Sequence, residues 1–496
     1  MSASHPKRWL ILAVILAAEC MDLLDGTVVN VAAPTIHREL RTSATGLQWI
    51  VGGYALALAV GLLTGGRLGD LFGRRRMFLV GASGFTAAST VCGVAPSTGI
   101  LIAARLIQGL AGAMMIPQGL GIMREVFSPE ELPKAFGLFG PVMGSAAMVG
   151  PIVGGGLIAL NLFGSGWRLV FLVNLPLGLL AIGGASRLLP RTRGTHAREL
   201  DVAGALLAAV GALAIVYPLM DGHELGWPAW TFAAMAAGVA LLAAFGWHLR
   251  RRQRAGRDPL VLPSTFAHRG YSAGALVLLL YFGGMVGAML AVTLFLQLGE
   301  GFSAIHAGLT LAPFALGTAL TAPLAAQRMN AGAGRALIQA GGAISLAGYA
   351  GVAIIMGATD RVSTWGLVAP LLVVGMGMGL FVVAAFNTIL AAVTDAETGS
   401  ASGVLNALQQ LGAAIGVAVL GTVFFTALQD AGFAAALRRT MWWEVAWLTA
   451  MLVVTPLLPR HARSEEELMT LTVAAEPAPA LAADAPLAAQ LGEQQL

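Results

Sequence analysis

Three acidic residues lie within one long apolar segment near the start of the chain. Glu19, Asp22 and Asp25 follow one another at intervals of three residues, so on a helix turning about 100° per residue they share one face. A charged side chain at the centre of a bilayer costs roughly 2.5 to 3.5 kcal/mol, so such residues usually serve a function. Because three close carboxylates in a medium of low dielectric constant cannot all stay ionised, we expect them to bind and release protons. The alternative is a permanent hydrogen bond to another helix or, for Glu19, solvation in an aqueous vestibule.

One arginine also lies inside an apolar segment. Arg105 cannot lose its proton, so in a membrane interior it must pair with carboxylate or carbonyl oxygens. We expect Arg105 to lie beside the three acids, so that their protonation changes its pairing. A static ion pair that only holds two helices together is the alternative. With the three acids, Arg105 completes the predicted proton-coupling group.

The composition identifies lipid as the solvent for most of the chain. Hydrophobic residues make up 57% of the 496 residues, charged residues make up 11%, and the mean hydropathy is +0.79. Globular proteins carry about 25% charged residues, which excludes an ordinary soluble domain. The two cysteines, Cys20 and Cys92, lie in apolar segments and suggest neither a disulfide framework nor a metal site. Both lysines, Lys7 and Lys134, lie outside any GxxxxGK[ST] pattern, so we expect no ATPase and, more broadly, no enzyme, cofactor or metal.

Apolar runs long enough to cross a hydrocarbon layer of about 30 Å recur along almost the whole chain. The fourteen expected helical spans are 9–33, 47–65, 77–95, 100–122, 136–160, 168–187, 203–221, 229–248, 271–297, 306–326, 335–356, 366–390, 402–427 and 441–458. The predicted fold class is therefore an all-α integral membrane protein.

The positions of the basic residues predict the orientation of these spans. With a cytoplasmic N-terminus, 22 of the 29 Lys and Arg residues fall on the cytoplasmic side, six fall on the other side, and Arg105 lies within a span. Cytoplasmic loops collect Lys and Arg, so we expect both termini to be cytoplasmic in a bacterial plasma membrane. The high pI of about 9.4 then reflects topology rather than a nucleic-acid partner. Residues 460–496 are rich in Ala, Pro, Glu and Gln and are typical of a disordered tail.

Two glycine-containing segments are candidates for moving parts. The loop after the second span carries charges and glycines that could latch and release two helical bundles: Gly66, Asp70, Gly73, Arg74 and Arg75. We expect its two glycines to turn the chain tightly. The fifth span has small residues and prolines that allow close helix contacts and bending: Gly140, Pro141, Gly144, Gly150, Pro151, Gly154 and Gly155. Simple anchoring of the loop, and static packing of the fifth span, are the alternatives.

Amide side chains within the spans are the expected lining of a substrate cavity. They are Asn30, Gln108, Asn387, Asn406, Gln409 and Gln410. Hydrogen bonds between helices are an equal alternative for those in the later spans. We expect no acid at mid-depth in the later spans, with Glu444 near an aqueous end.

Several of these segments resemble motifs of the major facilitator superfamily, specifically its fourteen-span drug:proton antiporter branch. LLDGTVVNVAAP at 23–34 is similar to the family's LDxTVVNVALP, which places its acid at Asp25. GRLGDLFGRRR resembles the loop motif GxLaDrxGrkx, and RLIQGLAGA at 105–113 resembles RxxQGxGaA, whose arginine is linked to proton transfer. Residues 150–155 are similar to the antiporter signature GPxxGG. Ala33 replaces the usual Leu, and Glu19 and Asp22 are additional acids, so the acid that carries the proton stays open.

The resemblance implies a fold and a function. The fold would be two six-helix bundles, 1–187 and 271–459, separated by two inserted helices within 188–270. The function would be proton-coupled export of lipophilic drugs or antibiotics, with a small lipophilic substrate, protons and the lipid bilayer as partners, and with the protein acting as a monomer. The alternatives are a dedicated exporter of one metabolite or self-made antibiotic, and a membrane scaffold or sensor without transport. The loop near Gln327 to Arg335 lacks an acid, so we expect asymmetric gating.

Overall fold

The computed structural model describes residues 6–128, 131–190, 200–329, 332–358, 363–394 and 397–459. The expected disordered tail, 460–496, lies outside these residues. All regular structure in the described residues is helical. The first half contains α1 (Arg8–Leu40), α2 (Ala44–Phe72), α3 (Arg74–Gly93), α4 (Thr98–Val126), α5 (Leu132–Leu160), α6 (Leu169–Leu172) and α7 (Asn174–Leu188). A middle pair, α8 (Val202–Leu225) and α9 (Ala229–Arg254), follows. The second half contains α10 (Arg269–Leu294), α11 (Ala304–Thr310), α12 (Ala312–Met329), α13 (Gly334–Ala358), α14 (Thr364–Leu390) and α15 (Thr398–Val454).

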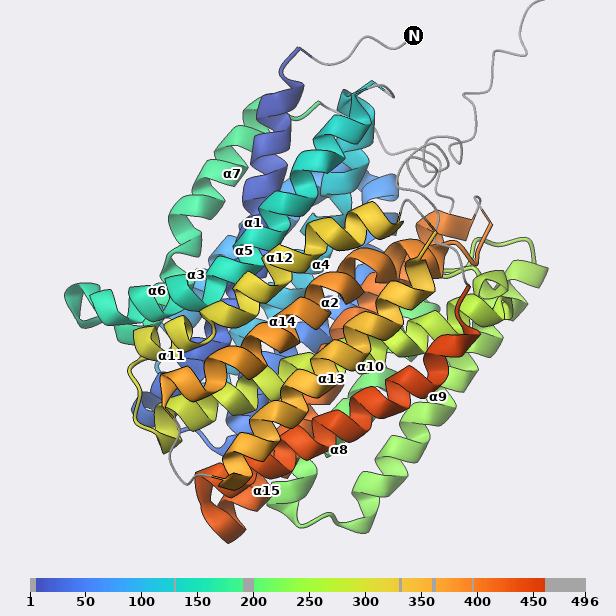
Figure 1. The fold of residues 1–496 in the computed structure, drawn as a ribbon. Helices are drawn as coiled ribbons and strands as arrows, with labels where there is room; N and C mark the ends of the chain where they lie inside the picture. The colour runs from blue at the N-terminus through green and yellow to red at the C-terminus, as the bar shows by residue number, and fades with distance from the viewer. Residues whose placement is uncertain are drawn as a thin grey trace, which may run out of the picture.

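Five short turns complete the described structure. Four of them are 3-10 turns, at Leu162–Gly164, Gly166–Arg168, Pro263–Ala267 and Thr455–Leu457. The fifth is a π-helical turn at Phe295–Gly299 that extends α10. The long helices lie side by side as one bundle, with α8 and α9 at one edge next to α15 (Figure 1).

Ten helical segments of the described chain are long and apolar enough to cross a membrane. This confirms a multi-pass membrane protein, although the count is lower than the fourteen spans expected. The expected span 402–427 falls within α15, which is 57 residues long, and the expected span 441–458 begins in α15 and ends just beyond it. Gly432 interrupts α15 with a φ of 79°, a backbone conformation that glycine adopts without steric cost. Gly283 of α10 lies against Gly412, before Gly432, and against Trp447, after it. Both segments of α15 therefore pack against α10.

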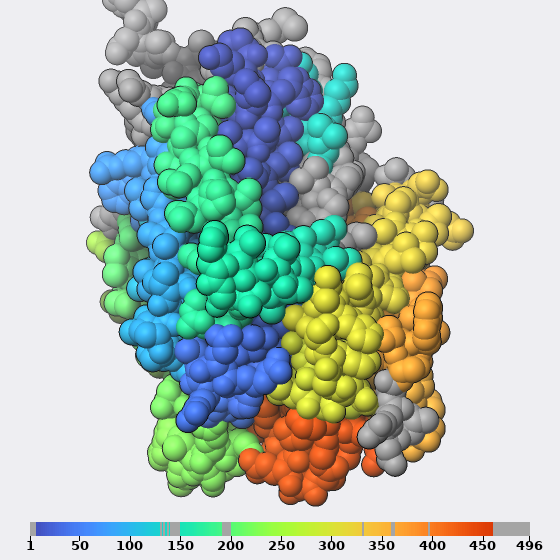
Figure 2. Space-filling model, turned by 90° about the vertical axis from the view of Figure 1, so that its left-hand side faces the viewer, coloured from blue at the N-terminus to red at the C-terminus, as the bar shows by residue number. Residues whose placement is uncertain are grey.

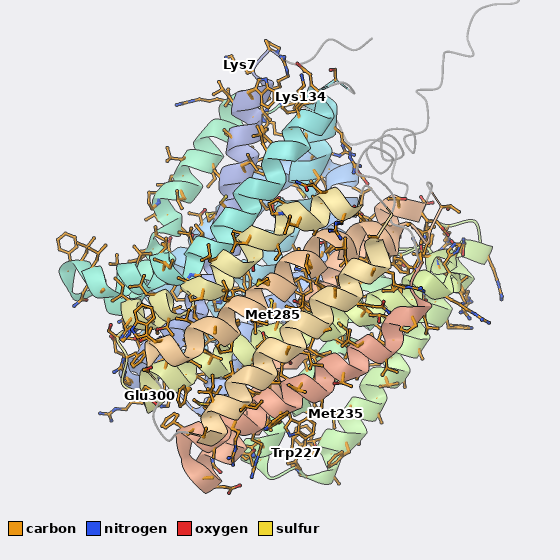
Figure 3. The ribbon with its side chains drawn as sticks, in the orientation of Figure 1. Lys7, Lys134, Trp227, Met235, Met285 and Glu300 are labelled. Carbon is orange, nitrogen blue, oxygen red and sulfur yellow. The ribbon has the colours of Figure 1, made fainter. Side chains whose placement is uncertain are left out.

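The bundle has two ends, which we call the N-terminal face, where α1 begins, and the far face, where α1 ends. Lys7 and Lys134 lie near the N-terminal face, and Trp227 and Glu300 lie toward the opposite end (Figure 3). Serine side chains start several helices: Ser43, Ser303 and Ser363 each accept a hydrogen bond from a backbone N–H three residues later. Such caps satisfy donors that a helix start leaves unpaired.

The two halves meet closely near the far face. The backbone of α11 packs directly against the end of α5, where a Cβ on Gly155 would lie 2.6 Å from the backbone oxygen of Ala304. Figure 2 shows this end of α5 in contact with α11 and α12, coloured yellow. Gln297, in the π-helical turn that follows α10, donates from Nε2 to the backbone oxygen of Val31 in α1 at 2.8 Å. The far face is therefore closed in this conformation.

The end of α8 contacts both halves at the far face. Trp49 of α2 donates from Nε1 to Asp221 at 2.8 Å, and the Thr45 N–H donates to Glu224 at 3.0 Å. On the other side, Thr422 of α15 donates to the backbone oxygen of Leu219 at 3.3 Å. The middle pair thus links the first and second halves where they approach each other.

Contacts near the N-terminal face tie the chain before α10 to the start of α15. Burial would raise the pKa of Glu397, but hydrogen bonds from Ser264 and Thr394, together with nearby His268, lower it to about 2. The His268 ring lies 3.2 Å from the Glu397 carboxylate. A pKa this low favours the ionised carboxylate at physiological pH, which maintains the contacts between the chain before α10 and the start of α15.

Candidate functional site

The centre of the candidate site is an ion pair buried inside the first half. Arg105 of α4 contacts the carboxylate of Asp25 in α1 through Nη1, and both side chains are at most 1% exposed. Arg105 Nε donates to the backbone oxygen of Ile50 at 3.1 Å. The guanidinium carbon also lies 4.0 Å from the centre of the Tyr54 ring, a favourable cation–π distance. The structure thus brings together the base and one of the acids that the sequence singled out.

Two amide side chains complete the hydrogen bonding of Asp25. Gln108 Nε2 and Asn174 Nδ2 donate to Asp25 Oδ1 at 2.8 and 2.9 Å, while Gln108 Oε1 accepts from Arg105 at 2.9 Å. Asn174 also donates to Ser89 at 2.9 Å. We expected Gln108 on a cavity wall, but it is fully buried, because both ends of its amide bind the ion pair. Asn174 was not singled out from the sequence. It could have been found as a lone amide side chain in the apolar run of the sixth expected span.

Asp22 has a hydrogen-bond partner of its own, distinct from those of Asp25. The Tyr54 hydroxyl of α2 donates to Asp22 Oδ1, and Asp22 is buried. The ring of the same tyrosine lies against the Arg105 guanidinium. Tyr54 therefore connects the second acid to the ion pair, a contact that no sequence pattern indicated.

Glu19 lies one turn farther along the same face of α1. It is buried and faces α4, since a Cβ on Gly119 would lie 3.1 Å from Glu19 Oε1. Among the described residues, neither Glu19 nor Asp22 forms an ion pair. The site therefore holds one permanent cation and three carboxyl groups, and burial without a cation favours the neutral form of a carboxyl group.

The residues expected to form a charged loop lie mostly in helices, because α2 continues to Phe72 and α3 begins at Arg74. Their described contacts are chiefly within the first half. Arg74 pairs with Asp70 at 3.6 Å and with Glu125 of α4 at 3.1 Å, and Arg75 donates to the backbone oxygen of Ser186 in α7. Gly73 makes the turn, with a φ of 91°. The expectation that Gly66 also turns the chain was wrong. It lies inside α2, whose backbone hydrogen bonding continues to the bond from the Gly73 N–H to the Gly69 oxygen.

The glycines of α5 face two different helices. All seven positions of the expected motif lie within this single helix, including Gly140, Pro141 and Gly144. Gly150 and Gly154 pack against Thr27 and Val28 of α1. The remaining pair, Pro151 and Gly155, contacts α11. Small residues thus permit close backbone approach on both sides of α5.

Gly155→Leu is predicted to open the far face. The nearest atoms to a side chain at this position are backbone atoms of Ala304 and Ile305, at 2.6 and 2.7 Å from the Cβ position. Backbone cannot move aside locally, and overpacking costs about 1 to 3 kcal/mol. This strain should shift the equilibrium between the packed and the separated states of the α5–α11 interface by roughly 5- to 150-fold toward the separated state.

The shift can be measured by maleimide labelling of Ala307→Cys, which lies buried in α11, in a chain with Cys20 and Cys92 replaced by serine. Labelling should accelerate in Gly155→Leu. Gly156→Leu is the matched control, because nothing lies within 4 Å of its Cβ position, and it should label like the parent. Equal labelling of all three chains would contradict a movable α5–α11 interface.

The remaining amides expected in a cavity occupy varied environments. Asn30 Oδ1 is buried without a hydrogen-bond partner among the described residues. Asn387 Nδ2 contacts the Met329 sulfur at 3.4 Å. The side chains in the first part of α15 are partly exposed: Asn406, Gln409 and Gln410. These three are accessible to a ligand, so their assignment to a cavity stays a prediction.

The expectation for Glu444 was wrong. Its side chain is fully buried about halfway between Gly432 and the end of α15, not near an aqueous end. The error arose because hydropathy alone placed the start of the last span at 441, whereas the helix resumes directly after Gly432, so Glu444 lies farther from the helix reversal and deeper in the bundle than expected.

The sequence as a whole is similar to antibiotic transporters and resistance proteins. It is 46% identical to the probable actinorhodin transporter of Streptomyces coelicolor, over 85% of this chain and 73% of that protein. It is 40% identical to a puromycin resistance protein of Streptomyces alboniger, over 84% and 82%. It is 32% identical to the tetracenomycin C resistance and export protein of Streptomyces glaucescens, over 86% and 78%.

The fold is similar to solved transporter structures. The crystal structure of the POT family transporter PepTSo superposes with a TM-score of 0.67, covering 92% of this chain and 98% of that one at 15% identity. The model of the Major Facilitator Superfamily matches residues 15–417, a range that includes the buried ion pair and most of both halves. The helical bundle and this match together show that the chain belongs to the Major Facilitator Superfamily.

Proposed function

We propose that this chain is a proton-coupled antiporter that exports lipophilic drugs or antibiotics across the bacterial plasma membrane. The observation that carries the proposal is the buried pair of Asp25 and Arg105, with two further carboxyl groups on the same helix face. An ion pair cut off from water, beside acids without a cation, is a place where one added proton changes the local balance of charge.

The chemistry follows from the contacts of Asp25. A proton on Asp25 would remove the charge that balances Arg105, leaving the guanidinium with the Gln108 amide oxygen and the Ile50 carbonyl. That change weakens the attraction between α1 and α4, so the two protonation states favour different packing of these helices. A substrate that binds better to one packing than to the other is then coupled to the proton. Asp22 and Glu19 are the alternative carriers.

The relatives favour antibiotics as the substrate class. Proteins named for actinorhodin, puromycin and tetracenomycin C share 32 to 46% of their aligned residues with this chain. These names also favour a second candidate, a dedicated exporter of one antibiotic. In either case a few polar groups among many apolar walls would set the specificity.

We further propose a topology of fourteen spans with both termini in the cytoplasm. It adds α1, α3, α5 and a division of α15 at Gly432 to the ten apolar segments, and the excess of Lys and Arg at the N-terminal face supports the orientation. The far face would then be extracellular, and the conformation described here would be closed to the outside. Residues 1–187 and 271–459 would form the two bundles, with 188–270 inserted between them. A single chain contains both bundles, which supports a monomer.

Proteoliposomes test the function directly. Efflux of ethidium, puromycin and actinorhodin would be followed under an imposed pH gradient, with an ionophore that collapses the gradient as the control. We expect gradient-dependent efflux of several probes. Movement of actinorhodin or puromycin alone would favour the dedicated exporter. If no probe moved, the proposal would fail in favour of a scaffold or sensor.

A further inference from the structure

The second half of the molecule contains a buried carboxyl group of its own. Glu444 of α15 is 0% exposed and lies against Gly284 of α10, where its carboxyl oxygens occupy the space that a side chain would take. The next residue of α10, Met285, lies near the middle of the bundle in Figure 3. Glu444 is therefore an acid at mid-depth, far from either face.

In the described part of the chain, hydrogen-bond donors lie around Glu444, but no basic side chain pairs with it. Neither carboxyl oxygen has a hydrogen-bond partner among the described residues, and the same holds for the Tyr349 hydroxyl and Trp447 Nε1. The titratable groups that face it electrostatically are Tyr281 of α10 and Tyr349 of α13. Tyr281 is already engaged with Ser345 at 2.9 Å. No described Lys, Arg or His forms an ion pair with Glu444.

These surroundings cannot hold a carboxylate. An ionised group in a dry interior needs a cation or several hydrogen bonds, and without them it takes up a proton instead. Asp25 differs in this respect, because Arg105 and two amides surround it. Asp25 and Glu444 are therefore buried in opposite charge states, because Asp25 is paired with a cation and Glu444 is not.

A possible route to Glu444 crosses the contact between α10 and the first part of α15. Gly283 packs against both the backbone of Gly412 and the Trp447 ring. Gln409 and Gln410, one turn before Gly412, are partly exposed. Gly283 and Gly284 are neighbours in α10, and Gly284 contacts the Glu444 carboxyl group. A displacement of α10 against α15 would therefore disturb the packing around Glu444 and could bring water to it.

We propose that Glu444 is a second proton-binding site, which holds a proton in the conformation closed at the far face and releases it when α10 and α15 separate. The inference rests on proton-coupled transport as the proposed function, and deepens it by adding a proton carried in the second half. The Tyr349 hydroxyl and Trp447 Nε1 have no hydrogen-bond partner among the described residues, so after α10 and α15 separate they would be free to donate to the carboxylate.

Infrared spectroscopy of the purified full chain tests proton binding without any substrate. A protonated carboxyl group gives a C=O stretching band, and we expect Glu444→Gln to remove such a band at neutral pH. Glu39→Gln is the control, because Glu39 is 43% exposed and paired with Arg168, and it should leave the band unchanged. Persistence of the full band in Glu444→Gln would overturn the proposal.

Steady-state accumulation tests proton release during transport. Puromycin gradients would be measured in proteoliposomes at a series of imposed pH gradients, comparing the parent with Glu444→Gln. Loss of one proton from the cycle should lower the limiting puromycin gradient about tenfold for each unit of pH gradient. Glu444→Leu should behave in the same way, because it also removes the exchangeable proton. An unchanged gradient in both variants would show a purely structural carboxyl group and overturn the carrier role.

Failure of the proposed transport function and failure of Glu444 as a proton-binding site would give different results. If the parent moved none of the probes under a pH gradient, the proposed function would have failed, and the infrared band alone would decide whether Glu444 binds a proton. If the parent were proton-coupled while Glu444→Gln kept both the band and the gradient, only the second site would have failed.

Discussion

Asp25→Asn is expected to abolish the response of efflux to a pH gradient while leaving exchange of substrate across the membrane intact. Asparagine has nearly the same shape as aspartate, but it cannot gain or lose a proton. It is therefore permanently neutral, as Asp25 is when protonated. Arg105 would keep its bonds to Gln108 and Ile50 and lose its only anionic partner in the described structure. Transport that continues without coupling would then run downhill only.

The measurement compares two assays on the same proteoliposomes. The part of puromycin efflux that depends on the pH gradient should vanish, as in protein-free vesicles, whereas exchange of labelled for unlabelled puromycin should continue. Asp22→Asn is the matched variant, since Asp22 lies on the same face of α1 but bonds Tyr54 rather than Arg105. If Asp25→Asn pumped like the parent and Asp22→Asn did not, the coupling acid would be Asp22.

Asp25→Asn also breaks the ion pair with Arg105 and so lowers the stability of the protein. This loss of stability must be distinguished from a loss of proton coupling. Removing one partner of a buried ion pair destabilises a protein by about 3 to 5 kcal/mol. Thermal unfolding of the purified variant should therefore accompany the flux measurements. An Asp25→Asn chain that exchanges puromycin normally is folded, and its failure to pump is then a failure of coupling.

Arg105→Lys is expected to reduce proton-driven efflux by about tenfold to a hundredfold and to shift its pH dependence. Lysine keeps the positive charge, but one terminal nitrogen does not reproduce the two separate nitrogens by which Arg105 binds Ile50 and Asp25, and lysine loses the planar contact with the Tyr54 ring. A hydrogen bond from a charged donor is worth about 1.5 to 3 kcal/mol, and each 1.4 kcal/mol corresponds to about a factor of ten.

The readout is the efflux rate measured as a function of internal pH. Arg168→Lys is the control, because Arg168 is also paired with a glutamate, Glu39, but lies at the exposed end of the first half, where ion pairs contribute about 0 to 1 kcal/mol. Normal transport by Arg105→Lys, with an unchanged pH profile, would show that Arg105 is a static tie between α1 and α4 and would remove it from the coupling mechanism.

The sequence by itself determined the solvent, the class of fold and the residues that needed an explanation. Hydropathy and charge content are local properties of the chain, so they identified apolar helices and a multi-pass membrane protein without knowledge of any contact. The interval of three residues between Glu19, Asp22 and Asp25 placed these acids on one face, because helix geometry is also local. The cost of burying charge was sufficient to single out Arg105.

Tertiary structure alone decided which of these groups meet. Asp25 and Arg105 are 80 positions apart, and Asp25 and Asn174 are 149 apart, so their pairing depends on how α1, α4 and α7 pack. The same is true of Tyr54 and Asp22, of Gln108 inside the ion-pair network rather than on a cavity wall, and of Glu444 at mid-depth. Long-range packing places side chains by the fit of whole helices, and no interval between residues along the chain carries that information.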